Sequence, residues 1–264
     1  MTQPPEKSVT ADRAAELLRL HRDPELLTVV NVWDVATARA VAALPGTRAI
    51  ATASHSIAAA FGYPDGEQIP VDLMLDMAGR IARAVDVPVT ADLEAGYGDA
   101  GETIRRAVGE GIVGANLEDE LKPIAESVAA VEAAIAAAEA EGVPFALNAR
   151  TDAFVHGRDR GRDVWIADAI ERGRAYLDAG ATTVFVPGNF GEDVVVELVA
   201  GLGEQRVSLI GLPEIPAPAR LQELGVARVS YGPLPQRVVL AELQDLASYL
   251  YDGGTLPRDL RPRG

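Results

Sequence analysis

The chain has 264 residues, with 24 Lys and Arg against 39 Asp and Glu, a formal net charge of −15, and no cysteine. This length is sufficient for one large domain with a continuous buried core. The acidic balance argues against a protein that binds nucleic acid or an anionic membrane through a basic surface. The lack of cysteine excludes disulfides, thiolate metal sites and cysteine nucleophiles.

The first 13 residues are polar and include Pro4 and Pro5. Such a segment has neither the apolar core of a signal peptide nor the length of a membrane anchor. We therefore expect a cytoplasmic protein with no membrane partner.

Short apolar runs alternate with helix-like stretches along the chain. The runs are short and almost continuously apolar, as in strands buried on both faces. Strands are predicted at 28–32, 49–53, 87–92, 113–118, 145–149, 183–186, 207–210 and 228–231. Between them, segments rich in Ala, Leu and Glu predict helices, among them 101–110, 124–141, 164–179 and 218–224.

The repeating unit indicates the fold class. Eight strands in 264 residues leave about 33 residues per unit, the spacing of a (β/α)8 TIM barrel of the α/β class. Gly111, Gly180 and Gly225 stand where helices must end before the next strand begins. The alternative is an open doubly wound sheet, but no GxGxxG turn follows the first strand. We expect residues 1–264 to form one barrel domain.

Carboxylates gather at the ends of the third and fourth predicted strands, where a barrel places its chemistry. Asp92 and Glu94 are two residues apart and would face the same side of a regular strand, and Glu118 ends the adjacent strand. Three converging carboxylates require a cation, with Mg²⁺ first and Mn²⁺ second. The alternative is a solvated acidic loop.

The fifth predicted strand ends in Asn148 and Arg150, and both are candidate substrate-binding residues. Arg150 is expected to clamp a substrate carboxylate with two hydrogen bonds; the alternative is a structural ion pair with Asp152 or Glu118. A metal ion beside an arginine suits a small 2-oxo acid, because the metal can chelate the substrate and stabilise an enolate.

Two further polar side chains fall in predicted site loops. His55 is a candidate proton carrier or substrate hydrogen-bond partner. Tyr63 is a candidate donor to an oxyanion, with packing beneath the loop as the alternative. His21 and His156 are expected at the surface.

Four motifs in this order resemble the isocitrate lyase/phosphoenolpyruvate mutase superfamily. They are Phe-Gly-Tyr-Pro-Asp at 61–65, Ala-Asp-Leu-Glu-Ala-Gly-Tyr-Gly at 91–98, Asn-Leu-Glu-Asp at 116–119 and Asn-Ala-Arg-Thr-Asp at 148–152. The resemblance implies a modified (β/α)8 barrel that binds Mg²⁺ and acts on a C–C or P–C bond beside a 2-oxo acid. It also implies a homo-oligomer, a dimer or a tetramer with a swapped C-terminal helix, with residues 240–264 as a possible contact.

The resemblance also implies roles for individual residues. Three carboxylates surround the metal directly or through water: Asp92, Glu94 and Glu118. Asp65 lies near substrate and metal, and Arg150 binds the substrate. The turn whose backbone amides cradle the substrate carboxylate corresponds to Ala53, Ser54 and His55.

The sequence departs from the family pattern in the loop that carries the general acid. The lyases use a cysteine in a Lys-Lys-Cys-Gly-His-type loop, and the mutase has a lysine where this chain has Glu120. We therefore expect a Mg²⁺-dependent lyase working through an enolate, either a retro-aldol lyase or an oxaloacetate-type decarboxylase. The alternatives are a P–C bond enzyme (phosphonopyruvate hydrolase or mutase) and a non-catalytic 2-oxo acid binding protein.

Overall fold

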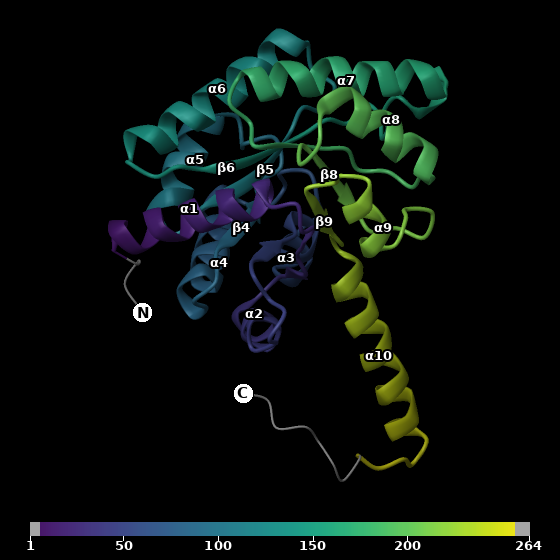
Figure 1. The fold of residues 1–264 in the computed structure, drawn as a ribbon. Coiled ribbons are helices and arrows are strands. Elements are labelled where there is room, and N and C mark those ends of the chain that lie inside the picture. The colour runs from purple at the N-terminus through teal and green to yellow at the C-terminus, as the bar shows by residue number, and fades with distance from the viewer. Residues whose placement is uncertain (1–5, 257–264) are drawn as a thin grey trace.

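A computed structural model describes residues 6–256, apart from the side chain at position 158. Within this range, nine strands form one parallel sheet in the order β1-β9-β8-β7-β6-β5-β4-β3-β2 (Figure 1). The strands are β1 (Leu27–Thr28), β2 (Asn31–Val32), β3 (Ile50–Thr52), β4 (Val89–Asp92), β5 (Gly114–Glu118), β6 (Ala146–Arg150), β7 (Thr183–Phe185), β8 (Val207–Ile210) and β9 (Arg228–Ser230).

The sheet closes on itself because β1 and β2 are two halves of one strand. Val29 N donates to Val229 O at 3.0 Å, and Ala51 N donates to Val30 O at 3.4 Å. Residues 27–32 thus pair with β9 on one side and β3 on the other. The result is an eight-unit barrel, which confirms the predicted fold class.

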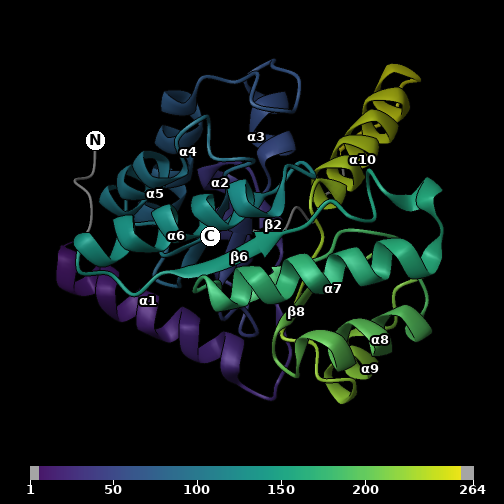
Figure 2. The ribbon, with the colours of Figure 1, turned by 90° about the horizontal axis from the view of Figure 1, so that it is seen from above.

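Helices surround this barrel (Figure 2). They are α1 (Lys7–Arg22), α2 (Val35–Ala42), α3 (Ser54–Ala60), α4 (Val71–Ala84), α5 (Ala100–Gly109), α6 (Ile124–Ala140), α7 (Arg162–Asp178), α8 (Glu192–Leu202), α9 (Pro218–Glu223) and α10 (Leu234–Tyr251), with a 3₁₀ turn η1 (Arg158–Arg160). The four predicted helices correspond to α5, α6, α7 and α9. The predicted strands are confirmed to within two residues at each end.

Local sequence signals fix several helix ends. The Asp34 carboxylate accepts the Thr37 N–H at 2.7 Å and caps α2, and Asp99 accepts the Glu102 N–H at 2.9 Å and caps α5. Gly111 has a φ of 87° directly after α5, which only glycine adopts at little cost. These signals fix where α2 and α5 begin and where the chain leaves α5.

A polar layer crosses the barrel interior just below the carboxyl ends of the strands. The Asn148 amide donates to Asn116 Oδ1 at 2.8 Å and to Ser208 Oγ at 3.3 Å, and Thr183 Oγ1 donates to Asn148 Oδ1 at 2.7 Å. Each of these residues is at most 6% exposed. The network ties four strands together beneath the end where Glu118 and Arg150 lie.

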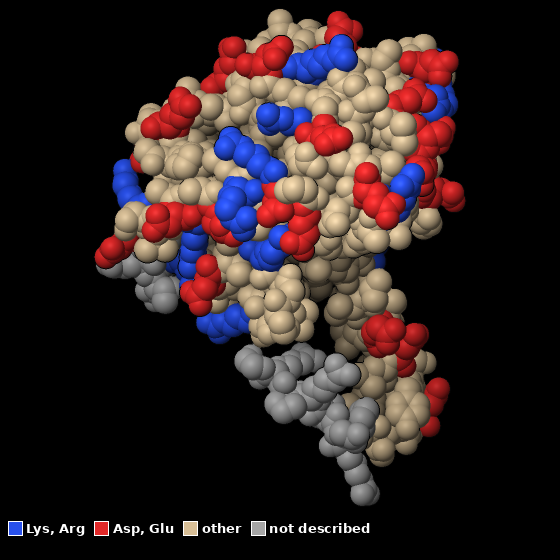
Figure 3. Space-filling view, viewed as in Figure 1, with Lys and Arg blue, Asp and Glu red and all other residues tan. Residues whose placement is uncertain are grey.

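The last described helix, α10, extends away from the barrel (Figure 1). Its exposed apolar side chains include Val239, Leu243 and Tyr249. The visible side of α10 is mostly uncharged, whereas both signs of charge are interspersed over the barrel (Figure 3). The end of the predicted 240–264 segment, from residue 257, lies outside the described residues. No described helix has the length and hydropathy needed to cross a membrane.

Candidate active site

Asp92 is the last residue of β4 and is held by the start of α3. Its Oδ2 accepts the Ser54 N–H at 3.2 Å and the Ser54 hydroxyl at 3.0 Å. Its own N–H donates to Thr52 Oγ1 at 3.0 Å. These bonds fix the carboxylate at the carboxyl end of the barrel, between the ends of β3 and β4.

Glu94 does not continue the strand, so the expectation that a regular strand aligns it with Asp92 is wrong. β4 ends at Asp92, and Glu94 has a φ of 51°. Its carboxylate accepts the Glu67 N–H and, at 3.2 Å, the Tyr97 hydroxyl. Burial raises the pKa of Glu94 to about 7, with the charges of Asp65 and Asp92 adding to the effect.

Three left-handed residues interlock two loops beside this carboxylate. Glu67, Glu94 and Tyr97 have φ values of 57°, 51° and 54°, a conformation that costs a non-glycine residue about 1–2 kcal/mol. The Glu67 carboxylate also accepts the Tyr97 N–H at 2.6 Å. The loop after α3 is therefore latched to the loop after β4.

Glu118 and Arg150 lie opposite each other on the paired ends of β5 and β6. Arg150 Nη1 is 2.5 Å from Glu118 Oε2, and Arg150 Nε donates to Asp152 Oδ1 at 2.7 Å. Burial raises the pKa of Glu118 although Arg150 opposes it. The ion pairs that the sequence left as the alternative reading are thus present.

Asp92 and Glu118 lie at neighbouring strand ends and Glu94 lies in the loop after β4, but the three carboxylates do not surround one common point. Asp92 is engaged by Ser54 and Glu118 by Arg150, and among residues 6–256 no group of three His, Cys, Asp or Glu is arranged as a metal cage. The all-oxygen donor set nevertheless fits Mg²⁺, which takes one or two carboxylates and keeps several waters. Burial raises the pKa of both Glu94 and Glu118, and the neighbouring carboxylates add to the effect.

Ser54, His55 and Asp65 form a partly exposed group at the rim of the acidic cluster. Ser54 Oγ donates to Asp65 Oδ1 at 3.4 Å, and His55 Nδ1 is 3.5 Å from Asp65 Oδ2. The side chains of His55 and Asp65 are 40% and 50% exposed. Ala53 is buried at the N-cap of α3. The predicted substrate turn therefore borders the acidic cluster, with its Ser54 N–H donating to Asp92.

Two other candidates lie apart from this group. Asn148 belongs to the buried polar layer beneath Arg150 and is 1% exposed. Tyr63 packs against the apolar core, as its alternative reading expected. His21 is 1% exposed, so the prediction that it lies at the surface is wrong: α1 precedes the barrel and carries His21 into the interior.

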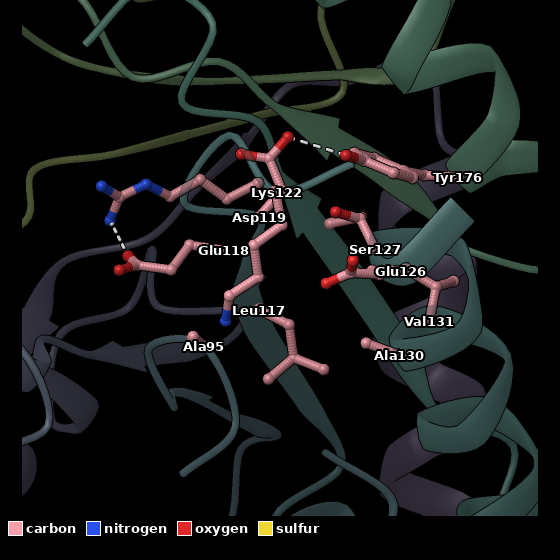
Figure 4. Close-up of a pocket in the computed structure, with 12 residues that line it drawn as sticks. Ala95, Leu117, Glu118, Asp119, Lys122, Glu126, Ser127, Ala130, Val131 and Tyr176 are labelled. Atoms are coloured by element: carbon pink, nitrogen blue, oxygen red, sulfur yellow. Dashed lines mark hydrogen bonds and ion pairs between the residues drawn. The ribbon is translucent and has the colours of Figure 1, made fainter. Parts of the chain in front are cut away.

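Sequence reasoning missed the residues that support the rim behind Glu118. Tyr176 Oη donates to Asp119 Oδ2 at 2.7 Å, and Arg172 Nη1 donates to the same oxygen at 3.2 Å. These residues come from α7, over 50 residues along the chain. Asp119 and Tyr176, together with Ser127 of α6, line a small cavity on the outer face of β5 (Figure 4). No local pattern in the sequence marks this long-range contact.

The comparison with known proteins gives the family. The phosphoenolpyruvate phosphomutase profile matches residues 17–251. The chain belongs to this family. It lies within the isocitrate lyase/phosphoenolpyruvate mutase superfamily, as the motifs indicated, and the expectation of an enzyme fold of that superfamily is confirmed.

Relatives named for different activities are similar over most of the chain. An uncharacterized protein of Mycobacterium tuberculosis is 31% identical over 248 residues, which is 91% of each chain. An oxaloacetate decarboxylase of Pseudomonas savastanoi is 30% identical over 74% of this chain and 70% of its own. The crystal structure of a candidate phosphonomutase from Burkholderia cenocepacia is 39% identical, with a TM-score of 0.84 over 90% of this chain and 99% of that chain.

Proposed function

We propose that the protein is a Mg²⁺-dependent lyase that cleaves a carbon–carbon bond of a small 2-oxo acid, or of its adduct, through an enolate. Oxaloacetate-type decarboxylation and retro-aldol cleavage both fit. The observation that carries the proposal is the placement of Asp92, Glu118 and Arg150 at three successive strand ends. Mg²⁺ (or Mn²⁺) held by Asp92, Glu94 and Glu118 would polarise the ketone and stabilise the enolate.

Arg150 binds the substrate carboxylate in this proposal. Its Nη1 and Nε are engaged by Glu118 and Asp152, but a guanidinium has five N–H donors in a planar fork. In this proposal the remaining donors bind the substrate carboxylate while both ion pairs stay intact. The two carboxylates hold the fork in place, which lowers the conformational entropy lost when substrate binds.

His55 is the proposed proton carrier to the enolate carbon. Its imidazole lies at the partly open rim, where protons exchange with water, and Asp65 lies 3.5 Å from Nδ1. A carboxylate at this position orients the ring toward the site. Tyr63 is the second candidate donor. A decarboxylase needs little besides a metal ion and a proton donor, so this reaction suits a chain without the cysteine loop.

A P–C bond enzyme is the second candidate, favoured by the 39% identity to the candidate phosphonomutase. A phosphonate needs several cations around it. Here Arg150 is shared between two carboxylates, and Lys122 lies 2.5 Å from Glu120. Phosphorus NMR of phosphonopyruvate incubated with enzyme and Mg²⁺ separates the two, because only P–C cleavage or transfer changes the phosphorus signal.

We further propose a cytoplasmic homo-oligomer, a dimer or a tetramer, assembled through α10. The helix carries exposed Val238, Leu243 and Tyr249, and exposed apolar patches of this kind mark interfaces. A swapped position of α10 against a second copy would bury them.

The experiment that tests the function is a Mg²⁺-supplemented panel of 2-oxo and 2-hydroxy diacids. Release of pyruvate, glyoxylate or CO₂ from one member supports carbon–carbon cleavage. Tight binding of oxalate or pyruvate with no turnover of any member would instead favour a binding protein.

A further inference from the structure

Arg228, the first residue of β9, points into the barrel. Its register partner on β8 is Ser208, whose hydroxyl accepts a hydrogen bond from Asn148 in the interior polar layer. Paired residues of neighbouring parallel strands lie on the same face of the sheet. Arg228 is 1% exposed and is among the largest fully buried side chains.

The charge of Arg228 has no direct partner among the described residues. Its Nε and Nη1 make no hydrogen bond, and within residues 6–256 no carboxylate is bonded to it, Asp92 acting on its charge only from a distance. Burial lowers the pKa of its guanidinium to about 10, so it stays protonated at neutral pH. A buried, unpaired charge of this kind is strongly unfavourable for folding.

Two titratable groups influence the charge of Arg228: His21, at the end of α1, is neutral, and Asp92, at the site, is negative. His21 Nδ1 bonds to Leu17 O at 2.8 Å, so that nitrogen carries the hydrogen and Nε2 is a lone-pair acceptor. Burial and the Arg228 charge lower the pKa of His21 to about 3, which keeps it neutral. Asp92 attracts the guanidinium from the carboxyl end of the barrel.

Arg172 is the contrasting case in the same fold. It is 8% exposed, but its guanidinium donates to Asp119, Asp168 and the Lys122 carbonyl. A buried arginine with such partners stabilises the fold, and removing it leaves Asp119 without its counter-charge. Arg228 has no comparable set of partners. Its burial therefore lowers the stability of the fold, and we expect its charge to have a role outside folding.

We propose that Arg228 is a positioning residue, an unpaired positive charge kept beneath the acidic cluster that acts on the site through Asp92. This inference rests on the proposed metal site. A fixed positive charge below that site weakens the binding of a divalent cation and strengthens the binding of an anionic 2-oxo acid, because charges act over a long range in a low-dielectric interior.

The test uses Arg228→Met, which removes the charge at similar volume, Arg228→Lys, which keeps it, and Arg172→Met as a paired buried arginine. The melting temperature of each is measured without metal. Mn²⁺ affinity is measured by titration calorimetry, and oxalate affinity at saturating Mn²⁺. A lost positive charge should change the affinities for Mn²⁺ and oxalate in opposite directions. A variant that only disturbs the structure should weaken both affinities.

We expect Arg228→Met to melt at or above the wild-type temperature and Arg172→Met to melt several degrees lower. We expect Arg228→Met to bind Mn²⁺ about threefold more tightly and oxalate about threefold more weakly, with Arg228→Lys near wild type in both. An insoluble or much less stable Arg228→Met, or affinities that are unchanged or shift together, would overturn the proposal. If the wild-type protein binds no Mn²⁺, the proposed function is wrong. The metal-free melting temperatures then still show whether Arg228 lowers the stability of the fold.

Discussion

Arg150 stands between Glu118 and Asp152, at 2.5 Å from the first carboxylate and 2.7 Å from the second. The Asp152 side chain is almost fully buried and that of Glu118 is 17% exposed. One guanidinium therefore compensates two carboxylates at the end where the barrel carries its chemistry. The same group serves stability and, in our proposal, substrate binding.

Replacing Arg150 by methionine should lower both stability and activity. The change leaves Glu118 and Asp152 without their cation, and breaking a buried pair costs about 3 kcal/mol. Urea unfolding measures that loss, and turnover should fall at least about a hundredfold, the size of a lost substrate ion pair. Arg105→Met is the control: Arg105 pairs with Glu102 on the surface, so its change should be within about 0.5 kcal/mol. Equal effects of the two variants would contradict the role of Arg150.

The metal-free protein should lose stability as the pH rises from about 5 to about 8. Glu94 titrates near 4.5 in the unfolded chain and at about 7 in the folded one, so the folded protein binds more protons in this window. The free energy of unfolding then falls with pH, by about 3 kcal/mol for a shift of this size. Glu118 shifts in the same direction. Unfolding at a series of pH values should show a flatter slope in Glu94→Gln; an unchanged slope would refute the assignment.

Removing the Tyr97 hydroxyl should loosen the latch between the two loops. Tyr97→Phe deletes the 3.2 Å bond to Glu94 and should cost about 1 kcal/mol of unfolding free energy. Tyr251→Phe is the matched control, because Tyr251 is 89% exposed. Faster hydrogen exchange at residues 62–70 in Tyr97→Phe, but not in the control, would localise the effect. Identical exchange in both would show that the latch does not depend on this bond.

An aspartate on the apolar face of α10 should dissociate the proposed oligomer. Leu243 is 58% exposed and Leu44, at the end of α2, is 59% exposed. Leu243→Asp introduces a charge that would be buried at the interface, whereas Leu44→Asp does not touch α10. Light scattering should report a lower mass for the first variant alone. A monomeric wild-type protein would remove the oligomer from the account.

The barrel could be predicted because its signals are local. Continuous apolar runs mark strands buried on both faces, and Gly111, Gly180 and Gly225 mark helix ends with φ values of 87°, 103° and 81°. Asp92, Glu118 and Arg150 were found for the same reason, since a strand's carboxyl end is a sequence position as well as a place in the barrel.

The missing parts depend on tertiary contacts. Nothing in the sequence around Glu94 indicates a left-handed backbone, because that conformation is stabilised by Glu67, 27 residues earlier. The inward position of Arg228 follows from barrel closure, and that of His21 from the path of α1. Asp92 and Glu94 would face the same side only on a regular strand, but the chain leaves the sheet after Asp92.

The central claim is metal-dependent carbon–carbon cleavage at the Asp92 end of the barrel. The most direct measurement follows pyruvate and CO₂ release from oxaloacetate, and from the other members of the 2-oxo diacid panel, in wild type, Asp92→Asn and Asp76→Asn. Asp76 is a surface residue paired with Arg80 and controls for the loss of one carboxylate. We predict Mg²⁺-dependent release in wild type and Asp76→Asn, and release within about threefold of the enzyme-free rate in Asp92→Asn. Equal release by all three proteins, or release unaffected by removal of Mg²⁺ with a chelator, would contradict the account.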